Sequence, residues 1–217
     1  MFGPDLPRFI AIIVAVLVAI DVHECCHAWM AAELGDPTAK NLGRVSLNPI
    51  VHLDPLGTLM ILWTALTGFG IGWGKPVPVD PYRLRYGPRT GMGIVSLAGP
   101  LANLTTAALL AVPFRMGVGV LPNLVLELLL VVSMVNIGLA IFNLLPLPPL
   151  DGYGVLMGIL GNIRAPWAYR WSYTLARYER YGPMILLLVI IADRYIPLFS
   201  SFIYPPYLLL TRLILGV

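Results

Sequence analysis

The stretch that decides the fold is Phe9 to Leu34, an apolar run that contains His23-Glu24-Cys25-Cys26-His27. An ionisable residue inside a membrane span costs roughly 3 kcal/mol and is by default a sign of function. On a helix, residues i and i+4 share a face about 6 Å apart, so both imidazoles can reach one metal ion. A catalytic zinc site takes three protein ligands and a water. The stretch therefore predicts a membrane helix that supplies two zinc ligands, with Glu24 placed to accept a proton from that water.

The composition predicts an all-α polytopic membrane protein. Of the 217 residues, 58% are apolar and only 12% are charged, against about 25% charged in a typical soluble domain. Several apolar runs approach the roughly 20 residues that a spanning helix needs. We expect one integral membrane domain over residues 1–217, with its core at about 8–161 and C-terminal helices at 165–217. The net charge of +3 comes from arginines beside the spans, and we expect no nucleic-acid partner.

Glycine, proline and charged residues divide the apolar runs into expected elements. The first span runs from about Arg8 to Leu34 and ends at Gly35-Asp36-Pro37. Further spans are expected at 91–114 and 122–145, followed by a short helix that ends near Gly161. Residues 165–180, in which Trp and Tyr alternate with arginines, are expected at the membrane interface. Two more apolar segments, 184–202 and 207–217, are separated by Pro205-Pro206.

The region from 36 to 90 is rich in Gly, Pro and polar residues and is expected to hold a short membrane-associated β-hairpin. Arg44-Val45-Ser46-Leu47 and Lys75-Pro76-Val77-Pro78-Val79 have the composition of short extended segments. The two prolines restrict the second segment to an edge strand. Between the two segments lies the apolar stretch 56–73.

A third zinc ligand has to come from another acid or histidine at membrane depth. Asp151 stands out because it follows 143–150, where prolines 146, 148 and 149 break the helix. A membrane tolerates unwound backbone only where protein or a cavity surrounds it, and broken helices build ion sites. The alternative is that Asp151 caps the next helix. His52 and Asp54 are expected to order the loop before residue 56, with a contact near the zinc as the alternative. The full set of candidates is Asp21, His52, Asp54, Glu127, Asp151 and Asp193.

These motifs together resemble the site-2 protease family of intramembrane zinc metalloproteases. The resemblance rests on HECCH at 23–27, GRVSLNPIVHLDPLG at 43–57, GWGKPVPV at 72–79, AGPLAN at 98–103 and NLLPLPPLDG at 143–152. It covers most of residues 20–155 and looks like the compact branch that lacks PDZ and CBS domains. The resemblance implies a hydrolase with one Zn²⁺ per chain, which cuts transmembrane protein substrates in or near their membrane segments.

The same resemblance assigns roles to individual residues. It implies that His23, His27 and Asp151 bind zinc and that Glu24 is the catalytic base. It also implies that Asn143 holds the substrate or the oxyanion. Asn103 is a further candidate for that contact, and the alternative for both asparagines is a hydrogen bond between helices.

Shared zinc ligands determine the expected topology. His27 lies near the end of the first span and Asp151 just past the span that begins near Pro122, so both ends face one side of the membrane. The spans 91–114 and 122–145 make one round trip, so residues 36–90 begin and end on that side. The stretch 56–73 is then re-entrant or interfacial.

The distribution of charge predicts which side this is. Only Arg8 and Arg115 fall clearly on the side opposite the zinc ligands, so the positive-inside rule places the zinc site toward the cytoplasm of the plasma or inner membrane. The cations on the zinc side are Lys40, Arg44, Lys75, Arg83, Arg85, Arg89, Arg164, Arg170, Arg177 and Arg180.

Two other classes of function stay open at this point. A catalytically silent membrane protein would keep zinc for structure or bind clients without cutting them, and the intact Glu24 argues against it. An ion or metal transporter would use the same ligands for transport, and the lack of internal repeats argues against it.

Overall fold

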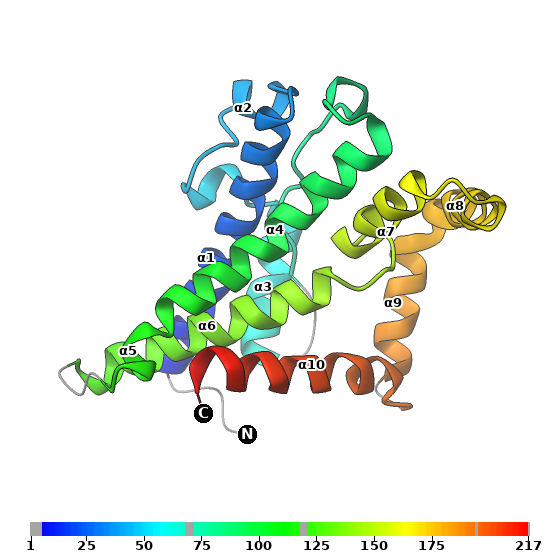
Figure 1. The fold of residues 1–217 in the computed structure, drawn as a ribbon. Coiled ribbons are helices and arrows are strands. Elements are labelled where there is room, and N and C mark those ends of the chain that lie inside the picture. The colour runs from blue at the N-terminus through cyan, green and yellow to red at the C-terminus, as the bar shows by residue number, and fades with distance from the viewer. Residues whose placement is uncertain (1–5, 68–71, 118–120, 194, 217) are drawn as a thin grey trace.

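The computed structural model describes residues 6–67, 72–117, 121–193 and 195–216, and its regular elements are helices (Figure 1). The α-helices are α1 (Leu6–Glu33), α2 (Thr38–Asn41), α3 (Pro55–Thr67), α4 (Pro88–Leu110), α5 (Val112–Arg115), α6 (Asn123–Asn143), α7 (Asp151–Asn162), α8 (Pro166–Tyr178), α9 (Gly182–Asp193) and α10 (Leu198–Leu215). Short 3-10 turns are η1 (Pro49–Val51), η2 (Pro81–Arg83) and η3 (Glu179–Tyr181). Among the described residues, α1, α4 and α6 are long and apolar enough to cross a membrane, which confirms the predicted helical membrane fold.

The core of the molecule forms around α4, which packs against α1, α6 and α7. Small residues let these helices approach closely, as is usual where lipid gives no hydrophobic drive for association. A Cβ atom added to Gly93 of α4 would lie 3.0 Å from the Cα of Gly158 in α7. One added to Gly154 would lie 2.3 Å from the Oγ of Ser96. The backbones of α4 and α7 are therefore almost in contact, which holds the start of α7 against the core.

The chain between α1 and α4 leaves the core and comes back to it. Asp36, completely buried, accepts hydrogen bonds from both the N–H and the hydroxyl of Thr38 and from the N–H of Asp80. Burial opposes ionisation of Asp36, yet these hydrogen bonds lower its pKa below 3.8. Further along, Leu53 and Gly74 form an antiparallel bridge, which brings the two ends of the 54–73 segment together. Residues 68–71, inside the stretch predicted to be re-entrant, lie outside the described residues.

The predicted β-hairpin is not found: the described residues contain this isolated bridge and no β-strand. Side chains take the backbone acceptors that a hairpin would use. Arg44 donates to the carbonyl of Lys75, and His52 Nε2 donates to the carbonyl of Ser46 at 2.8 Å. Prolines 76 and 78 also remove two of the N–H donors from the second segment. The two segments are thus connected through side chains.

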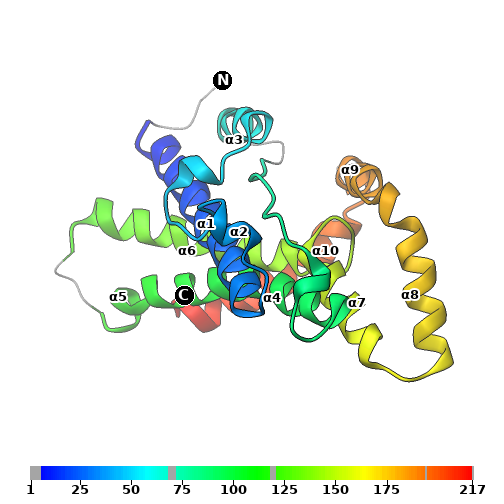
Figure 2. The same cartoon turned by 90° about the horizontal axis from the view of Figure 1, so that it is seen from above.

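The C-terminal helices lie outside this core. Figure 2 shows α8 and α9 beyond α7, and α10 running beneath α4 and α6. The sequence predicted a break at Pro205-Pro206, but both prolines lie inside α10. The two prolines remove two backbone N–H donors from α10, and packing of this helix offsets that loss. Its side chains pack on a cluster from α4 and α6; they are Ile203, Tyr207, Leu210 and Ile214. That cluster consists of Ala107, Ile137 and Ile141.

Candidate metal centre

Three side chains from two distant parts of the chain converge at the core. The Nε2 atoms of His23 and His27 lie 2.9 and 3.2 Å from the same oxygen, Oδ2 of Asp151. One ligating atom from each residue lies within 4.8 Å of the other two, and both histidines are buried. The two imidazole rings meet edge to face, with centroids 4.5 Å apart. Two imidazoles and a carboxylate form the set of three protein ligands that catalytic zinc sites use.

A chain of buried amides orients His23. Its Nδ1 lies 2.6 Å from Oδ1 of Asn103, whose amide nitrogen donates to the carbonyl of Ala19 and to Oδ1 of Asn136. Asn136 in turn donates to the carbonyl of Val132. Because the amide nitrogen of Asn103 faces two acceptors, its oxygen must face His23, and Nδ1 of His23 must carry the proton. The lone pair of His23 then lies on Nε2, which points at Asp151.

His27 is oriented by the backbone of α4. Its Nδ1 lies 2.8 Å from the carbonyl of Val95, which can only accept, so this nitrogen also carries the proton and Nε2 is free. Gly99 makes room for the ring, because a Cβ atom there would lie 2.5 Å from Nε2 of His27 and 2.7 Å from Cε1 of His23. Both histidines therefore present the unprotonated nitrogen that a metal requires.

The third candidate ligand, Asp151, is the first residue of α7. Leu150 before it is extended and is the N-cap position, and no side chain caps α7, so Asp151 is not the cap that the alternative interpretation proposed. Gly152 allows the tight approach of this turn to the end of α6, since a Cβ atom there would lie 2.2 Å from the carbonyl oxygen of Leu144. The Asp151 carboxylate points its Oδ2 at both Nε2 atoms, so the three potential ligand atoms face one another. The carboxylate is thus available as a ligand.

Glu24 lies on the wall of a cavity of about 770 Å³ beside these ligands, and His23 and Asn143 line the same cavity. The rest of the wall is mostly apolar and comes from Ile20, from α3, α6 and α9, and from residues 72–74 and 149–150. A Cβ atom at Gly74 would lie 3.5 Å from Oε1 of Glu24 and 2.7 Å from Ile20, so this glycine lets the 72–74 segment pass close to the carboxylate. The site therefore combines a polar end, where the ligands are, with an apolar space large enough for several side chains.

Arg44 is a residue of this site that the sequence did not single out. Only 5% of it is exposed. It donates to the carbonyl of Lys75 and lies close enough to Glu24 for the two charges to interact. Burial lowers its pKa, and the charge of Glu24 opposes that shift. A buried cation beside a membrane carboxylate is the signal that would have identified it.

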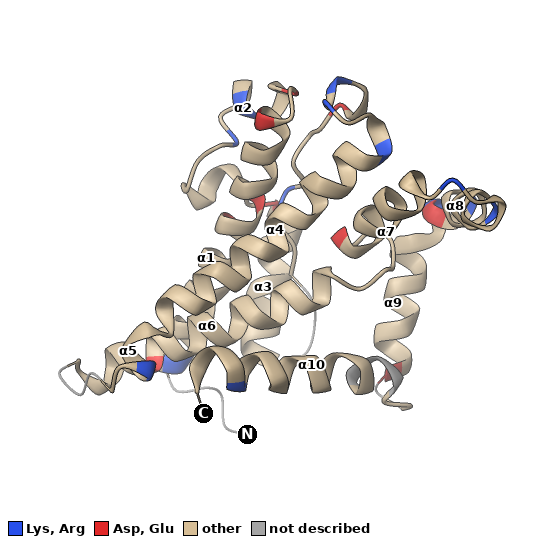
Figure 3. Ribbon diagram, viewed as in Figure 1, with Lys and Arg blue, Asp and Glu red and all other residues tan. Residues whose placement is uncertain are grey.

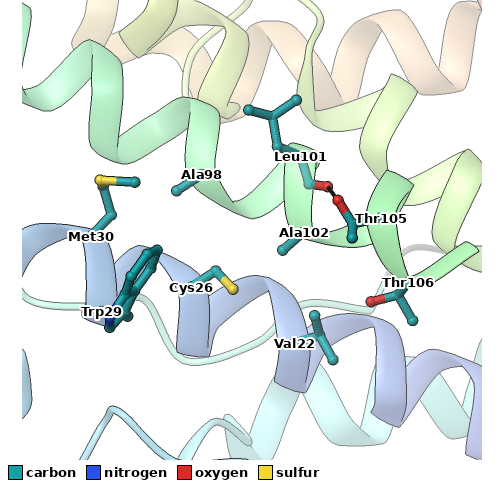
Figure 4. Close-up of a pocket in the computed structure, with 9 residues that line it drawn as sticks. All are labelled: Val22, Cys26, Trp29, Met30, Ala98, Leu101, Ala102, Thr105 and Thr106. Carbon is teal, nitrogen blue, oxygen red and sulfur yellow. Dashed lines mark hydrogen bonds between the residues drawn. The ribbon is translucent and has the colours of Figure 1, made fainter. Parts of the chain in front are cut away.

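The other face of the zinc motif lines a separate, smaller pocket of about 400 Å³ between α1 and α4 (Figure 4). Cys26 lies in this pocket with Val22, Trp29 and Ala98, away from the metal ligands. Both cysteines are free thiols that are half-buried. Neither thiol belongs to the group of converging ligand atoms found in the described part of the chain.

The remaining candidates take different positions. Asn143 lines the cavity and donates to the carbonyl of Leu139 within its own helix, so its amide oxygen is not used by that bond. Asn103 is fully buried, and both of its polar atoms serve the His23 network. His52 is also fully buried, 3.5 Å from Asp21. Asp54 accepts from the N–H of Gly57 at the start of α3. In this arrangement Asn143 alone of the two predicted asparagines reaches the cavity.

The chain is similar to curated zinc metalloproteases over most of its length. It is 37% identical over 201 residues to "Putative zinc metalloprotease YwhC" of Bacillus subtilis (strain 168), which covers 89% of this chain and 84% of that protein. The chain belongs to the site-2 protease family. Proteins named "Putative zinc metalloprotease Rip2" from Mycolicibacterium smegmatis and Mycobacterium tuberculosis are 33% and 32% identical over 150 residues, which is 56% of their length. No family model matches the chain, and no solved structure matches it significantly.

Membership of the site-2 protease family agrees with the helical structure. The chain is a membrane protein with apolar helices of spanning length, and its relatives are zinc metalloproteases by name. The ion of this family is zinc, and the converging histidines and aspartate have the donor atoms and the protonation that zinc requires.

Proposed function

We propose that the protein is an endopeptidase that hydrolyses peptide bonds in or near the transmembrane segments of other membrane proteins. The observation that carries the proposal is the placement of Glu24 on the wall of an apolar cavity, next to His23 and the ligand group. In this proposal His23, His27 and Asp151 hold the zinc ion. When bound, zinc polarises the scissile carbonyl and makes the attacking water more acidic.

Glu24 moves the protons of the reaction. Its carboxylate accepts a proton from the attacking water, whose oxygen forms a bond to the carbonyl carbon of the substrate. Glu24 then gives that proton to the peptide nitrogen as the C–N bond breaks, so the products are an amine and a carboxylic acid, which loses its remaining proton to water. Arg44 places a positive charge near Glu24.

The substrate has to be extended at the site, because a helix satisfies its own backbone hydrogen bonds and hides its carbonyls. The segment 75–79 has no regular secondary structure and directly follows residues 72–74, which line the cavity. Among the described residues, the N–H groups of Val77 and Val79 donate to no acceptor. We propose that these groups pair with the backbone of an unwound substrate and that Asn143 contacts it in the cavity.

The proposed topology places the site toward the cytoplasm. Figure 3 shows Lys and Arg residues gathered where α2, the start of α4 and α8 lie, and fewer at the opposite end near α5 and α10. By the positive-inside rule, the end of the molecule that carries more Lys and Arg faces the cytoplasm of the plasma or inner membrane. In this proposal the zinc ligands lie toward that side, together with α2 and α8. The meeting of Leu53 and Gly74 supports α3 as a re-entrant element in place of a crossing.

The proposal is tested by measuring the rate at which the Glu24→Gln variant cleaves a substrate. Purified wild type, Glu24→Gln and the control Glu33→Gln, an exposed glutamate at the end of α1, are compared in vesicles that contain a tagged single-span substrate. We expect Glu24→Gln to lose at least a hundredfold in rate, since a positioned base contributes roughly 10²–10⁴. Zinc content should be unchanged, because Glu24 is not a ligand. Full activity of Glu24→Gln would refute the proposal, and so would wild type that holds zinc without cutting any client.

A further inference from the structure

α8 is an amphipathic helix whose surface is mostly uncovered in the molecule. It packs on α7, and its two buried residues are Ala168 and Ser172. Aromatic side chains that would normally be buried in a soluble protein are instead largely exposed. They are Trp167 (53%), Tyr169 (72%), Trp171 (60%), Tyr173 (72%) and Tyr178 (54%). Such a surface requires a partner.

The side chains of α8 are sorted by helical spacing into separate faces. Trp167 and Trp171 are four residues apart, and Tyr178 is seven beyond Trp171, so the three share one face. Arg170 and Arg177 are seven apart and share another face, opposite the buried Ala168 and Ser172 side of the helix. An aromatic stripe beside an arginine stripe is typical of helices that lie in the membrane interface.

The position of α8 agrees with that arrangement. In Figures 1 and 2, α8 runs across the direction of α9, the apolar helix that follows it. Charge around α8 is strongly biased, with Arg164, Arg170, Arg177 and Arg180 against the single acid Glu179. That acid is already engaged, since Tyr153 of α7 donates to it at 3.1 Å. Burial and the charge of Glu179 raise the pKa of Tyr153 to about 12, so its hydroxyl remains a donor.

We propose that α8 lies in the plane of the membrane surface and binds the headgroups of anionic phospholipids. Tryptophan rings of the first face enter the boundary of the acyl chains. Arg170 and Arg177 donate to the phosphate groups, for which the guanidinium fork is well matched. The favoured partner is a lipid surface because the aromatic stripe and the arginine stripe run side by side along the whole helix.

The contact of α8 with lipid would affect the proposed zinc site through the two helices on either side of α8. On one side α8 is joined to α7, whose first residue is Asp151. On the other side it leads into α9, which lines the cavity with Leu186, Leu187 and Ile190. The lipid contact itself does not rest on the proposed proteolysis, and the experiment below measures binding alone.

A fluorescent reporter on α8 tests the proposal. Cys25 and Cys26 are replaced by alanine, and Thr174→Cys, between the two stripes, is labelled with bimane. The protein is reconstituted in vesicles of equal parts phosphatidylcholine and phosphatidylglycerol. Small amounts of either lipid carrying the same nitroxide-labelled acyl chain are added as quenchers. An arginine near an anionic surface strengthens lipid attraction roughly fivefold, so we expect phosphatidylglycerol to quench several-fold more strongly than phosphatidylcholine.

Two charge variants complete the test. Arg170→Gln/Arg177→Gln should bring the ratio of the two quenching efficiencies close to one, with an unchanged unfolding midpoint. The control Lys40→Gln/Arg85→Gln removes two exposed cations, one in α2 and one just before α4, and should keep the wild-type ratio. A ratio near one in wild type, which is the result if another protein or a second copy covers α8, would overturn the proposal. An equal fall in both variants would overturn it too.

Discussion

The metal centre and the far wall of its cavity are built from different kinds of residue. The centre lies between α1, α4, α6 and α7, where many side chains are small or polar and buried. Asn103 and Asn136 are completely buried and hydrogen bonded to each other. On the far wall, α9 is apolar and exposed, with Leu187 and Leu188 each 57% accessible. Within α9 the buried residue is Gly182.

This difference follows from what each region has to do. A metal centre needs ligands held to within a fraction of an ångström, and buried amide networks supply that rigidity because breaking them leaves unpaired polar groups. A cavity wall that admits a membrane segment needs apolar surface and few fixed contacts. We therefore expect substitutions in the core to change zinc binding, and substitutions in α9 to change substrate binding alone.

The largest effect is expected for Asp151→Ala, which removes one of the three proposed ligands. Proteolysis should fall to background and zinc occupancy after dialysis should drop well below one per chain, because two imidazoles alone hold zinc weakly. Elemental analysis of the purified protein measures the occupancy. The control is Glu127→Ala, an exposed acid on α6. Stoichiometric zinc in folded Asp151→Ala would mean that another acid completes the site.

A smaller effect is expected for Asn103→Leu, which removes the acceptor of His23 but no ligand. Loss of such a partner typically costs about 10- to 100-fold in metal affinity or activity. Competition with a zinc chelator measures the affinity, and Asn123→Leu at the exposed start of α6 is the matched control. If Asn103→Leu binds zinc as wild type does but has a raised KM, Asn103 contacts the substrate, and the core network has been misread.

The sequence predicted the centre better than its surroundings. The HExxH pattern, and the LDG segment that follows a helix broken by prolines, can each be recognised from a few consecutive residues. His23, His27 and Asp151 could therefore be selected before the structure showed that they converge. Asn103 was also selected, with a hydrogen bond between helices as one of its two expected roles, and it does bond to α1 and α6. Its pairing with His23 could not be predicted, because contacts of α4 with α1 and α6 are not encoded in either helix alone. Asn136 did leave a signal, as a polar residue in an apolar helix.

The errors have a common physical cause. The β-hairpin and the break at Pro205-Pro206 were inferred from local backbone preference, and in both places tertiary contacts decided the outcome. Side chains of Arg44 and His52 occupy the acceptors of the two extended segments. Packing of α10 on α4 and α6 keeps it helical through its prolines.

The smallest effect is expected on the cavity wall. Leu187 lines the cavity and its neighbour Leu188 does not, although the two are equally exposed. Leu187→Ala should raise KM for a single-span substrate by roughly fivefold, in line with about 1 kcal/mol for a partly buried leucine. Leu188→Ala should leave KM unchanged, and both variants should keep full zinc occupancy. Equal KM values for the two variants would show that substrates do not use this wall.

X-ray absorption at the zinc edge tests the central claim most directly, because it reports the atoms that contact the metal in the active protein. The proposed centre predicts two imidazole nitrogens at about 2.0–2.1 Å and oxygen at about 2.0–2.2 Å, with the imidazole signal reduced by half in His27→Ala. The spectrum should contain no sulfur. A sulfur shell at about 2.3 Å would assign the zinc to Cys25 or Cys26 and contradict the His23–His27–Asp151 centre.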